Sequence, residues 1–481
     1  MKEKVVNGLF WKLLENGGAQ GIQFVVAVIL ARLLTPEEYG TIGIITIFII
    51  IANVIVQNGF STALVQKQEA DETDFSSVFY FGLGAALIMY GVLYISAPSI
   101  ARFYDDGILC PLVRVLGIVL FPGSVISIQT AYVSRKMEFR GLFKATMLAV
   151  VLSGIISIWM ACQGMGVWAM AGQQMVYYFA LMTGLFLDVS WKPKVLFSMS
   201  RVRNMFRFGW KLLCAALLDT LFGNLYGLIM GKIYNQRILG IYNRGEQFPK
   251  LVATNLGAAI QSVLLPAFAR AQDDVSQVRN MARKAIQVSS YVVLPMLTGM
   301  LAVADSLILA LLGEKWMVCV PYLQIMCIAY CFYPIHITNL QAINAMGRSD
   351  IFLKLEVTKK ILGIAGLLAG IHFGAIVMVS IKALVDFLCI FINAWPNKRI
   401  LNYSIGRQWM DMFPALCLSV VMGGIVYGIG LFLPGVWGRL ILQIIAGIGV
   451  YVALSLVFRV KSFFYLWDIV KRRMSRSAAD N

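Results

Sequence analysis

The chain has 481 residues, of which 59% are hydrophobic and only 14% are charged, and its net charge is +17. A soluble domain carries about 25% charged residues, so this composition predicts a polytopic membrane protein. Twelve or more spans of about 20 residues would use most of the length, which excludes a sizeable soluble domain.

Fourteen apolar runs follow one another along the chain and predict fourteen membrane-spanning helices. We place them at residues 9–34, 41–64, 76–97, 112–133, 142–162, 166–187, 207–232, 241–268, 286–312, 317–345, 352–371, 374–394, 409–433 and 438–458. The first run is too long for a signal peptide and lacks a small-residue cleavage site, so we expect it to be retained. The uncharged stretch from Ala145 to Leu187 exceeds one span, and the QGMG sequence at 163–166 divides it into two helices.

Lys and Arg are distributed unevenly between the loops. If the N-terminus is cytoplasmic, 31 of the 41 Lys and Arg lie on cytoplasmic loops and flanks, 9 lie on the outer side, and Lys382 lies within a span. Cytoplasmic loops of membrane proteins carry such an excess of positive charge. The pattern predicts cytoplasmic termini and an even number of spans, and it accounts for the net charge without a nucleic-acid partner.

A sequence repeat divides the chain. The WKLL sequence at 11–14 returns at 210–213, and in both copies a basic residue precedes a glycine by eight positions, Arg32 before Gly40 and Lys232 before Gly240. Because each copy holds six spans, both have the same orientation. We therefore expect two lobes related by a pseudo-twofold axis along the membrane normal, with a cleft between them.

The predicted fold is an all-α polytopic membrane protein of about 14 transmembrane helices, with two six-helix lobes and two extra C-terminal helices. The expected parts are an N-lobe at 1–190, a basic cytoplasmic linker at 191–206, a C-lobe at 207–395, spans 13 and 14 at 396–460, and a basic cytoplasmic tail at 461–481.

Residue types that carry enzymatic or metal chemistry are scarce. The eight cysteines are scattered without a CxxC pair, and there are only two histidines, so we expect neither a metal site nor disulfides. No GxxxxGK[ST] sequence occurs, and we expect no ATP-driven transport and no cofactor.

Polar side chains at membrane depth are the candidate substrate-cavity residues, because burying them in a bilayer is costly. They are Glu15, Asn16, Gln20 and Gln23 in the first span, Arg114 in the fourth, Asp219 and Asn224 in the seventh, Arg244, Glu246 and Lys250 in the eighth, and Lys382 and Asp386 in the twelfth. Lys382 and Asp386 are four residues apart and can pair, either as a structural pair or in a cavity. Arg32 and Lys232 fit snorkelling at the outer rim better.

Several cations in a membrane cleft suit an anionic substrate. A diphosphate group forms strong charge-assisted hydrogen bonds with Arg and Lys. The Asn and Gln side chains and the abundant aromatic residues would suit sugars, which present both hydroxyl groups and apolar faces.

Short motifs spread from the first to the eleventh span carry a family resemblance. They are LARLLTPEEYG at 30–40, GFSTALVQK at 59–67, GMGVWA at 164–169, LGIYNR at 239–244, LGEKW at 312–316 and GRSD at 347–350. In this order and spacing they resemble the polysaccharide transporters of the multidrug/oligosaccharidyl-lipid/polysaccharide (MOP) superfamily. The chain looks most like the Wzx-type export proteins for lipopolysaccharide, colanic acid or teichuronic acid.

This resemblance implies a flippase with no enzymatic activity. It would move an undecaprenyl-diphosphate-linked oligosaccharide across the bacterial plasma membrane by alternating access, with a polysaccharide polymerase and glycosyltransferases as partners. The superfamily also implies coupling to a proton or sodium gradient, for which Glu15 and Asp219 are our candidate titrating groups.

Other interpretations remain open. A cation-coupled drug antiporter of the same superfamily would favour acidic cavity residues, against the basic excess near the outer cleft, whereas a lipid II flippase would share fold and chemistry. A glycan polymerase or ligase usually carries a large external loop, and the longest external connection here has only about fifteen residues. A scaffold that transports nothing would not need buried polar residues in both repeats.

Overall fold

The structure, a computed structural model, describes residues 2–57, 61, 64–65, 67, 70–468 and 471. In these residues every regular element is helical, which confirms the all-α prediction. The end of the span expected at 41–64, most of the motif at 59–67 and most of the tail expected at 461–481 lie outside the described residues.

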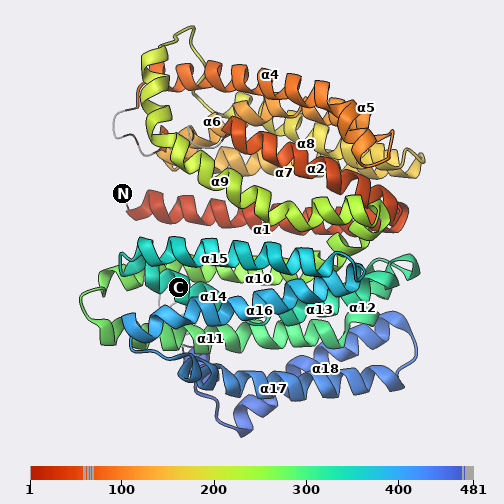
Figure 1. The fold of residues 1–481 in the computed structure, drawn as a ribbon, viewed down its shortest axis with the longest axis vertical. Helices are drawn as coiled ribbons and strands as arrows, with labels where there is room; N and C mark the ends of the chain where they lie inside the picture. Colours follow the sequence, from red (N-terminus) through yellow and green to blue (C-terminus); the bar gives the residue numbers. More distant parts are fainter. Residues whose placement is uncertain are drawn as a thin grey trace, which may run out of the picture. The chain divides into compact units, whose positions relative to one another are not determined.

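The chain forms two compact units, Met1–Gly240 (unit 1) and Ile241–Asn481 (unit 2). The helices of unit 1 are labelled in Figure 1. They are α1 (Lys2–Leu33), α2 (Pro36–Gln57), α4 (Glu72–Phe103), α5 (Leu109–Gly117), α6 (Leu120–Lys136), α7 (Phe139–Cys162), α8 (Val167–Asp188) and α9 (Met199–Ile233).

The remaining helices belong to unit 2, although α10 starts with its first turn in unit 1. They are α10 (Gln236–Arg270), α11 (Val275–Ala302), α12 (Ala304–Leu311), the 3-10 helix η1 (Glu314–Cys319), α13 (Val320–Tyr330), α14 (Tyr333–Ala345), α15 (Ser349–Gly370), α16 (Ala375–Ile400), α17 (Ile405–Phe432) and α18 (Val436–Val457).

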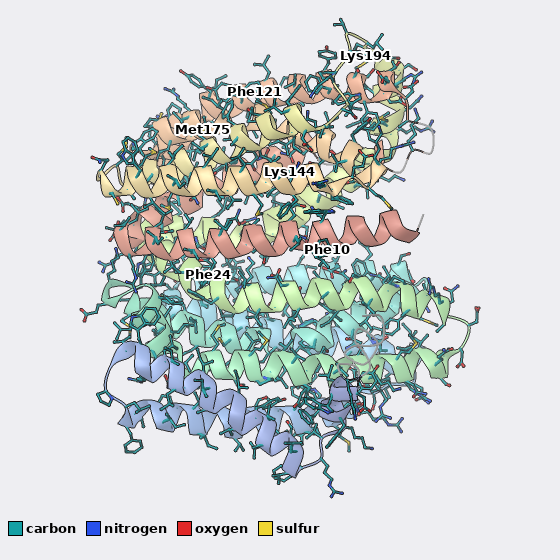
Figure 2. The ribbon with its side chains drawn as sticks, turned by 180° about the vertical axis from the view of Figure 1, so that it is seen from behind. Phe10, Phe24, Phe121, Lys144, Met175 and Lys194 are labelled. Carbon is teal, nitrogen blue, oxygen red and sulfur yellow. The ribbon has the colours of Figure 1, made fainter. Side chains whose placement is uncertain are left out.

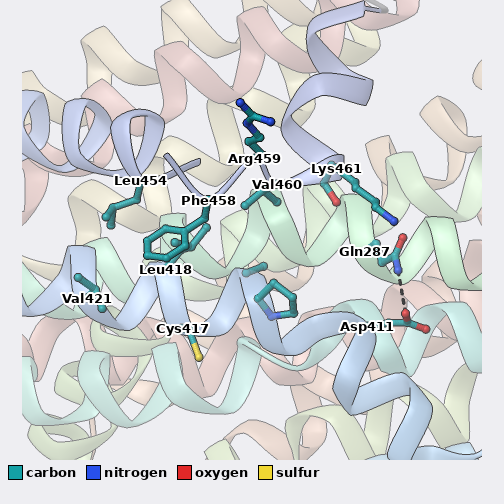
Figure 3. A pocket seen from close by; sticks show the side chains of 13 residues that line it. Gln287, Asp411, Cys417, Leu418, Val421, Leu454, Phe458, Arg459, Val460 and Lys461 are labelled. Atoms are coloured by element: carbon teal, nitrogen blue, oxygen red, sulfur yellow. Dashed lines mark hydrogen bonds between the residues drawn. The ribbon is translucent and has the colours of Figure 1, made fainter. Parts of the chain in front are cut away.

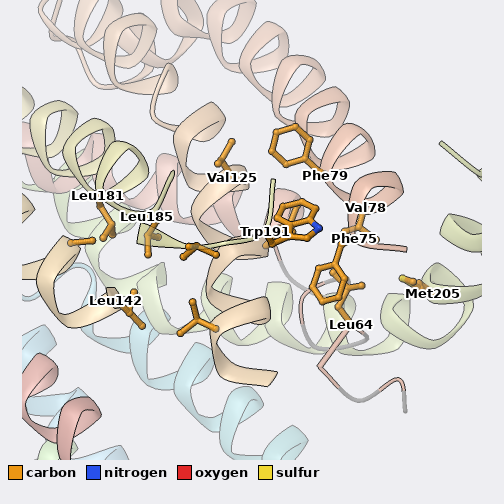
Figure 4. Packing of buried hydrophobic residues seen from close by; sticks show 14 of the residues in the cluster. Leu64, Phe75, Val78, Phe79, Val125, Leu142, Leu181, Leu185, Trp191 and Met205 are labelled. Carbon is orange, nitrogen blue, oxygen red and sulfur yellow. The ribbon is translucent and has the colours of Figure 1, made fainter. Parts of the chain in front are cut away.

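Unit 1 is held together by antiparallel helix pairs and a core of large side chains. Helix α7 packs against α8 and α1, and α9 packs against α2 and α4. Trp191, which follows α8, is 4% exposed and lies 5.7 Å from the ring of Phe75 and 6.2 Å from that of Phe79 (Figure 4). Buried aromatic pairs of this kind stabilise a fold beyond their apolar area. The start of the expected linker is therefore anchored in the core of unit 1.

Helix α9 belongs to unit 1, because it packs against α2 and α4 of that unit. The sequence repeat assigned residues 207–395 to the second lobe, and this boundary remains a prediction about which segments are equivalent copies. In unit 2, α11 packs along α17, α15 along α16, and α17 along α18. The two C-terminal helices are thus part of the body of unit 2.

Twelve of the described helices are long and apolar enough to cross a membrane, so the protein is a multi-pass membrane protein. The two other expected spans, at 166–187 and 352–371, form α8 and α15, with 22 residues each. Gln173 and Gln174 make α8 less apolar, whereas α15 carries five charged residues, Asp350, Lys354, Glu356, Lys359 and Lys360. Helices of 22 residues measure about 33 Å, enough to cross a hydrocarbon core of roughly 30 Å.

Large apolar side chains also project from the helix surfaces. Phe10 and Phe24 on α1 are 55% and 37% exposed (Figure 2). A soluble protein avoids an extended apolar surface, whereas a lipid-facing one requires it.

The two copies of the repeat meet at Gly40 and Gly240. A Cβ atom on Gly40 would overlap the main-chain oxygen of Gln236, and a Cβ on Gly240 would overlap that of Pro36. Pro36 and Gln236 each precede their glycine by four residues, so they are equivalent positions of the two copies. The contact is therefore reciprocal: the glycine of each copy packs on the first turn of the other copy's helix.

Candidate substrate site

Glu246 and Lys382 form an ion pair within unit 2. The Nζ atom of Lys382 lies 2.9 Å from Oε1 of Glu246, and their side chains are only 18% and 13% exposed. The hydroxyl of Tyr330 donates a hydrogen bond of 3.2 Å to the same oxygen. Because these residues belong to α16, α10 and α13, the pair connects three helices that are distant in sequence.

The surroundings of the pair are aromatic and of low polarity. The Nζ of Lys382 lies 5.9 Å from the ring centre of Tyr242 and 3.9 Å from the Sδ of Met326. On the other side, Nζ of Lys250 lies 4.0 Å from Oε2 of Glu246. A medium of low polarity strengthens the attraction between the charges and raises the cost of leaving either one alone.

Arg244 lies two residues before Glu246 on α10 and is only 6% exposed. Its guanidinium donates a hydrogen bond to the Oε1 of Gln247 and lies 5.8 Å from the ring centre of Trp316, which is fully buried. Arg244 thus packs on η1 through a cation–π contact, as Arg often does with Trp.

Asp386 follows Lys382 by one helical turn of α16, as the spacing predicts. Its main-chain oxygen lies 3.1 Å from Nε2 of His336, while Nδ1 of His336 lies 2.7 Å from Nδ2 of Asn393. Both ring nitrogens of His336 therefore have partners, which fits a packed polar residue between α14 and α16.

Glu15 is buried in unit 1, with 8% exposure. Its Oε2 lies 2.7 Å from Nζ of Lys12, and its Oε1 accepts a hydrogen bond of 3.3 Å from Thr146 on α7. Its three expected neighbours on α1 all have exposed side chains: Asn16, Gln20 and Gln23. The polar face of α1 thus combines one buried carboxylate with three exposed amides.

The other candidates in unit 1 lie apart from Glu15. Arg114 stacks on Tyr94, with 4.2 Å between guanidinium and ring centre. Asp219 is exposed on α9, and Asn224 donates a hydrogen bond of 2.8 Å to the main-chain oxygen of Thr220. The structure therefore gathers Glu246, Lys250 and Lys382 in unit 2, with Arg244 and Asp386 within about one turn of them, and distributes the unit 1 candidates over several helices.

The outer-rim cations predicted from the repeat differ in their environment. Lys232 lies 2.9 Å from the carboxylate of Asp105, whereas Arg32 has an exposed side chain. In the described part of the chain no cluster of three or more His, Cys, Asp or Glu has the arrangement of a metal site.

Asp411 is the centre of a polar cluster that the sequence reasoning missed. Arg283 on α11 binds both its carboxylate oxygens at 2.8 and 2.9 Å, and Gln287 and Tyr403 each donate a hydrogen bond of 2.8 Å. Arg283 and Asp411 are 128 positions apart, and each begins an apolar run. No local spacing in the sequence connects the two residues.

A second missed cluster consists of buried amides. Asn339 donates a hydrogen bond of 2.8 Å to Gln408, and Asn397 donates one of 2.7 Å to Asn339. All three side chains are almost fully buried, Asn339 in the middle of α14, Asn397 near the end of α16 and Gln408 in the first turn of α17. Asn339 lies within the apolar run expected at 317–345, whereas Asn397 and Gln408 flank the runs at 374–394 and 409–433, so no sequence pattern connects the three.

Acidic and basic side chains join α4 to α9 at one end of unit 1. Asp74 is fully buried and lies 2.5 Å from Nζ of Lys67 and 3.2 Å from Arg201. Burial alone would raise the pKa of Asp71, but the amide of Asp74 and the guanidinium of Arg201 hold it below its usual value. The basic first turn of α9 thus binds the acidic start of α4.

Comparison with known proteins decides the family. The family model for polysaccharide biosynthesis proteins matches residues 29–321, more than half of the chain. The chain belongs to this family. The family resemblance expected from the motifs is therefore confirmed, and the matched region contains Arg244, Glu246 and Lys250.

Curated relatives of this family member resemble it along almost the whole length. The teichuronic acid biosynthesis protein TuaB of Bacillus subtilis is 24% identical over 437 residues, which cover 89% of each chain. The succinoglycan biosynthesis transport protein ExoT of Rhizobium meliloti is 22% identical over 485 residues and covers 98% of this chain and 97% of its own.

A solved structure supports the fold. The lipid II flippase MurJ, in its inward closed conformation, superposes with a TM-score of 0.76 over 94% of this chain and 98% of its own, at 12% identity. At this identity the likeness concerns the fold alone, and this fold agrees with the all-α polytopic architecture expected from the sequence.

Proposed function

We propose that the protein is a flippase that exports a polysaccharide repeat unit linked to undecaprenyl diphosphate. The observation that carries the proposal is the family match over residues 29–321. A relative named as a transport protein for succinoglycan biosynthesis covers nearly all of the chain, and the fold is that of a membrane transporter. Alternating access of the two lobes moves the head group while the lipid tail stays in the bilayer.

The cluster around Glu246 supplies the chemistry that such a head group needs. Lys382 and Lys250 bring two positive charges to Glu246, and Arg244 lies two residues before Glu246 on α10, where it packs on Trp316. A diphosphate competes with Glu246 for Lys382, since charge-assisted hydrogen bonds to phosphate are strong. Glu246 then acts as the internal counter-ion of Lys382 when no substrate is bound.

Cellular context follows from the same proposal. The protein lies in the bacterial plasma membrane with both termini in the cytoplasm, as the distribution of Lys and Arg predicts. It breaks and forms no covalent bonds, receives its substrate from glycosyltransferases and delivers it to a polysaccharide polymerase.

Coupling to a proton or sodium gradient is a further part of the proposal. Glu15 is buried beside Lys12 and Thr146, and Asp219 is exposed on α9. Replacing both by amides, Glu15→Gln with Asp219→Asn, is expected to make transport independent of an imposed gradient. Transport that still follows the gradient in this double variant excludes both residues as the coupling groups.

The deciding experiment follows flipping in proteoliposomes. A short oligosaccharide on undecaprenyl diphosphate is loaded into one leaflet, and its appearance in the other is measured. We expect Arg244→Ala and Lys250→Ala each to lower the initial rate about tenfold, the effect of losing a charged hydrogen bond. Lys398→Ala, which removes an exposed cation at the end of α16, is the control and should keep the rate of the unmodified protein.

Three outcomes are distinguishable. If the Arg244 and Lys250 variants flip the substrate at the rate of the unmodified protein, the proposed function stands and the proposed site is wrong. If the protein flips lipid II but no other diphosphate-linked glycan, its function is in cell-wall synthesis. Absence of flipping together with efflux of a cationic dye replaces the proposal by a drug antiporter.

A further inference from the structure

A cavity of about 650 Å³ lies at one end of unit 2, apart from the Glu246 cluster. It is formed by α11, α17, the end of α18 and the segment that follows (Figure 3). Its wall is mainly apolar and includes Leu418, Val421, Leu454 and Phe458. Its polar and charged lining side chains are Gln287, Asp411, Arg459, Lys461 and Ser462.

The carboxylate of this cavity has hydrogen-bond partners, whereas its two cations have no ion-pair partner among the described residues. Asp411, the carboxylate among the described lining residues, receives hydrogen bonds from Arg283, Gln287 and Tyr403. Arg459 and Lys461 have exposed side chains, and neither has an ion-pair partner in the part of the chain that the structure describes. In Figure 3 the side chain of Lys461 extends toward Gln287. The cavity thus offers two available cations beside an apolar wall.

The backbone at Arg459 is unusual. Its φ angle is 48°, in the left-handed region, and the amides after α18 close the helix by bonding back to Leu456 and Ser455 at 3.2 and 3.0 Å. Glycine is the usual residue at such a helix end. An arginine there costs about 1 kcal/mol. Strained positions concentrate at functional sites, which makes the side chain of Arg459 a candidate for ligand binding.

Two neighbouring features place the cavity at a membrane surface. The helical residues after Lys461 include the exposed Phe464, Tyr465 and Trp467, and aromatic residues gather at membrane–water interfaces. A second apolar cavity of about 380 Å³ lies on the same three helices and begins at Pro295 of α11. Pro295 lies eight residues after Gln287, which is about 12 Å along the helix. The two cavities are therefore separated by somewhat less than the thickness of one hydrocarbon leaflet, roughly 15 Å.

We propose that this cavity binds an anionic phospholipid of the surrounding bilayer. Its phosphate contacts Arg459 and Lys461, and its acyl chains follow Leu418 and Val421 toward the second cavity. The cations favour an anionic lipid over a zwitterionic one, because each Lys or Arg near the surface adds attraction for negative charge. The bound lipid links α17 and α18 to α11 and stabilises the C-terminal helix pair.

The test uses the full chain in nanodiscs of phosphatidylcholine with and without phosphatidylglycerol. Native mass spectrometry counts the lipids that remain bound, and thermal unfolding is followed in parallel. Arg459→Gly combined with Lys461→Ala removes the cations, and glycine suits the backbone at 459. Lys398→Ala with Arg399→Ala, at the end of α16, is the control with the same change in charge. Val421→Trp fills the apolar part without changing any charge.

We expect phosphatidylglycerol to be enriched on the unmodified protein and to raise its unfolding temperature. The Arg459–Lys461 variant should lose about fivefold in enrichment for each cation, while the control keeps it. Val421→Trp should also release the lipid. The proposal is overturned if enrichment survives the loss of both cations, if it survives Val421→Trp, or if undecaprenyl phosphate displaces phosphatidylglycerol from the unmodified protein. None of these outcomes depends on whether the protein flips a glycan.

Discussion

Single residues decide how charge is held inside unit 2. Glu246 accepts from both Lys382 and Tyr330, so removing the lysine leaves a carboxylate in aromatic surroundings without its main partner. We expect Lys382→Met to lower the free energy of unfolding by about 3 kcal/mol, because an uncompensated buried charge is costly. Thermal unfolding of the purified protein in detergent measures this effect.

The double variant provides the control for that measurement. Glu246→Gln together with Lys382→Met removes both charges and should recover much of the stability, since an uncharged pair carries no unpaired charge. If Lys382→Met alone melts like the unmodified protein, the ion pair makes no contribution to the fold.

The pair Arg348 and Asp350, at the start of α15, predicts a pH dependence. Two hydrogen bonds of 3.0 Å from Arg348 lower the pKa of Asp350 from 3.8 to about 2. A depressed pKa stabilises the folded state above the unfolded value, and this contribution disappears as the pH falls from 3.8 toward 2. Arg348→Ala should therefore lower the unfolding temperature slightly at pH 6 and have no effect near pH 2. An equal effect at both pH values would contradict the assignment.

Elements meet most closely where the two repeat copies touch. Gly40→Ala and Gly240→Ala each place a methyl group on a main-chain oxygen, so a helix must move. Overpacking of this kind costs about 1–3 kcal/mol or more. Gly84→Ala on α4 is the matched control, because a Cβ there meets nothing within 4 Å. Thermal unfolding should show a loss for the first two variants and none for the third; three equal results would refute the close approach.

Local patterns in the sequence predicted most elements, but they missed three breaks. The spans expected at 112–133, 286–312 and 317–345 are interrupted between α5 and α6, between α11 and α12, and between α13 and α14. Apolar runs separated by turns predicted α7 and α8 as a hairpin, and the repeat predicted that Gly40 and Gly240 are equivalent. The partner of Lys382 was not accessible in this way. Spacing suggested Asp386 on the same helix, while the structure adds Glu246 from α10, 136 positions away.

The Asp411 cluster shows the same limit. Its members come from α11, α17 and the loop before α17, and each one separately resembles a charge or hydroxyl group at a membrane surface. Only packing of α11 along α17 brings them together. A single sequence contains local periodicity but no record of such distant contacts.

The whole molecule must have a defined orientation in the membrane. If α8 and α15 both cross, as their length allows, Lys194 is cytoplasmic and Glu314 lies outside; both side chains are exposed. In a chain without its native cysteines, we expect Lys194→Cys to react with an impermeant maleimide only after the membrane is opened. Glu314→Cys should react in intact cells.

Two results would change this topology. If Lys194→Cys reacts in intact cells, either the N-terminus lies outside or α8 does not cross. The predicted topology places three crossings, α9, α10 and α11, between the two positions, and each of these helices is long and apolar enough to span. If both cysteines react from the outside, the number of crossings between them must be even, and the predicted three would be wrong.

The reciprocal packing of Gly40 and Gly240 also has a historical consequence. Contact between the same turn of two copies is the arrangement found at the twofold interface of a homodimer. A gene duplication that fused two such subunits would preserve it inside one chain, with the first turn of each half still resting on the glycine of the other. After such a fusion, a larger residue at either glycine would press on the other half, so the two positions would share one constraint on side-chain size.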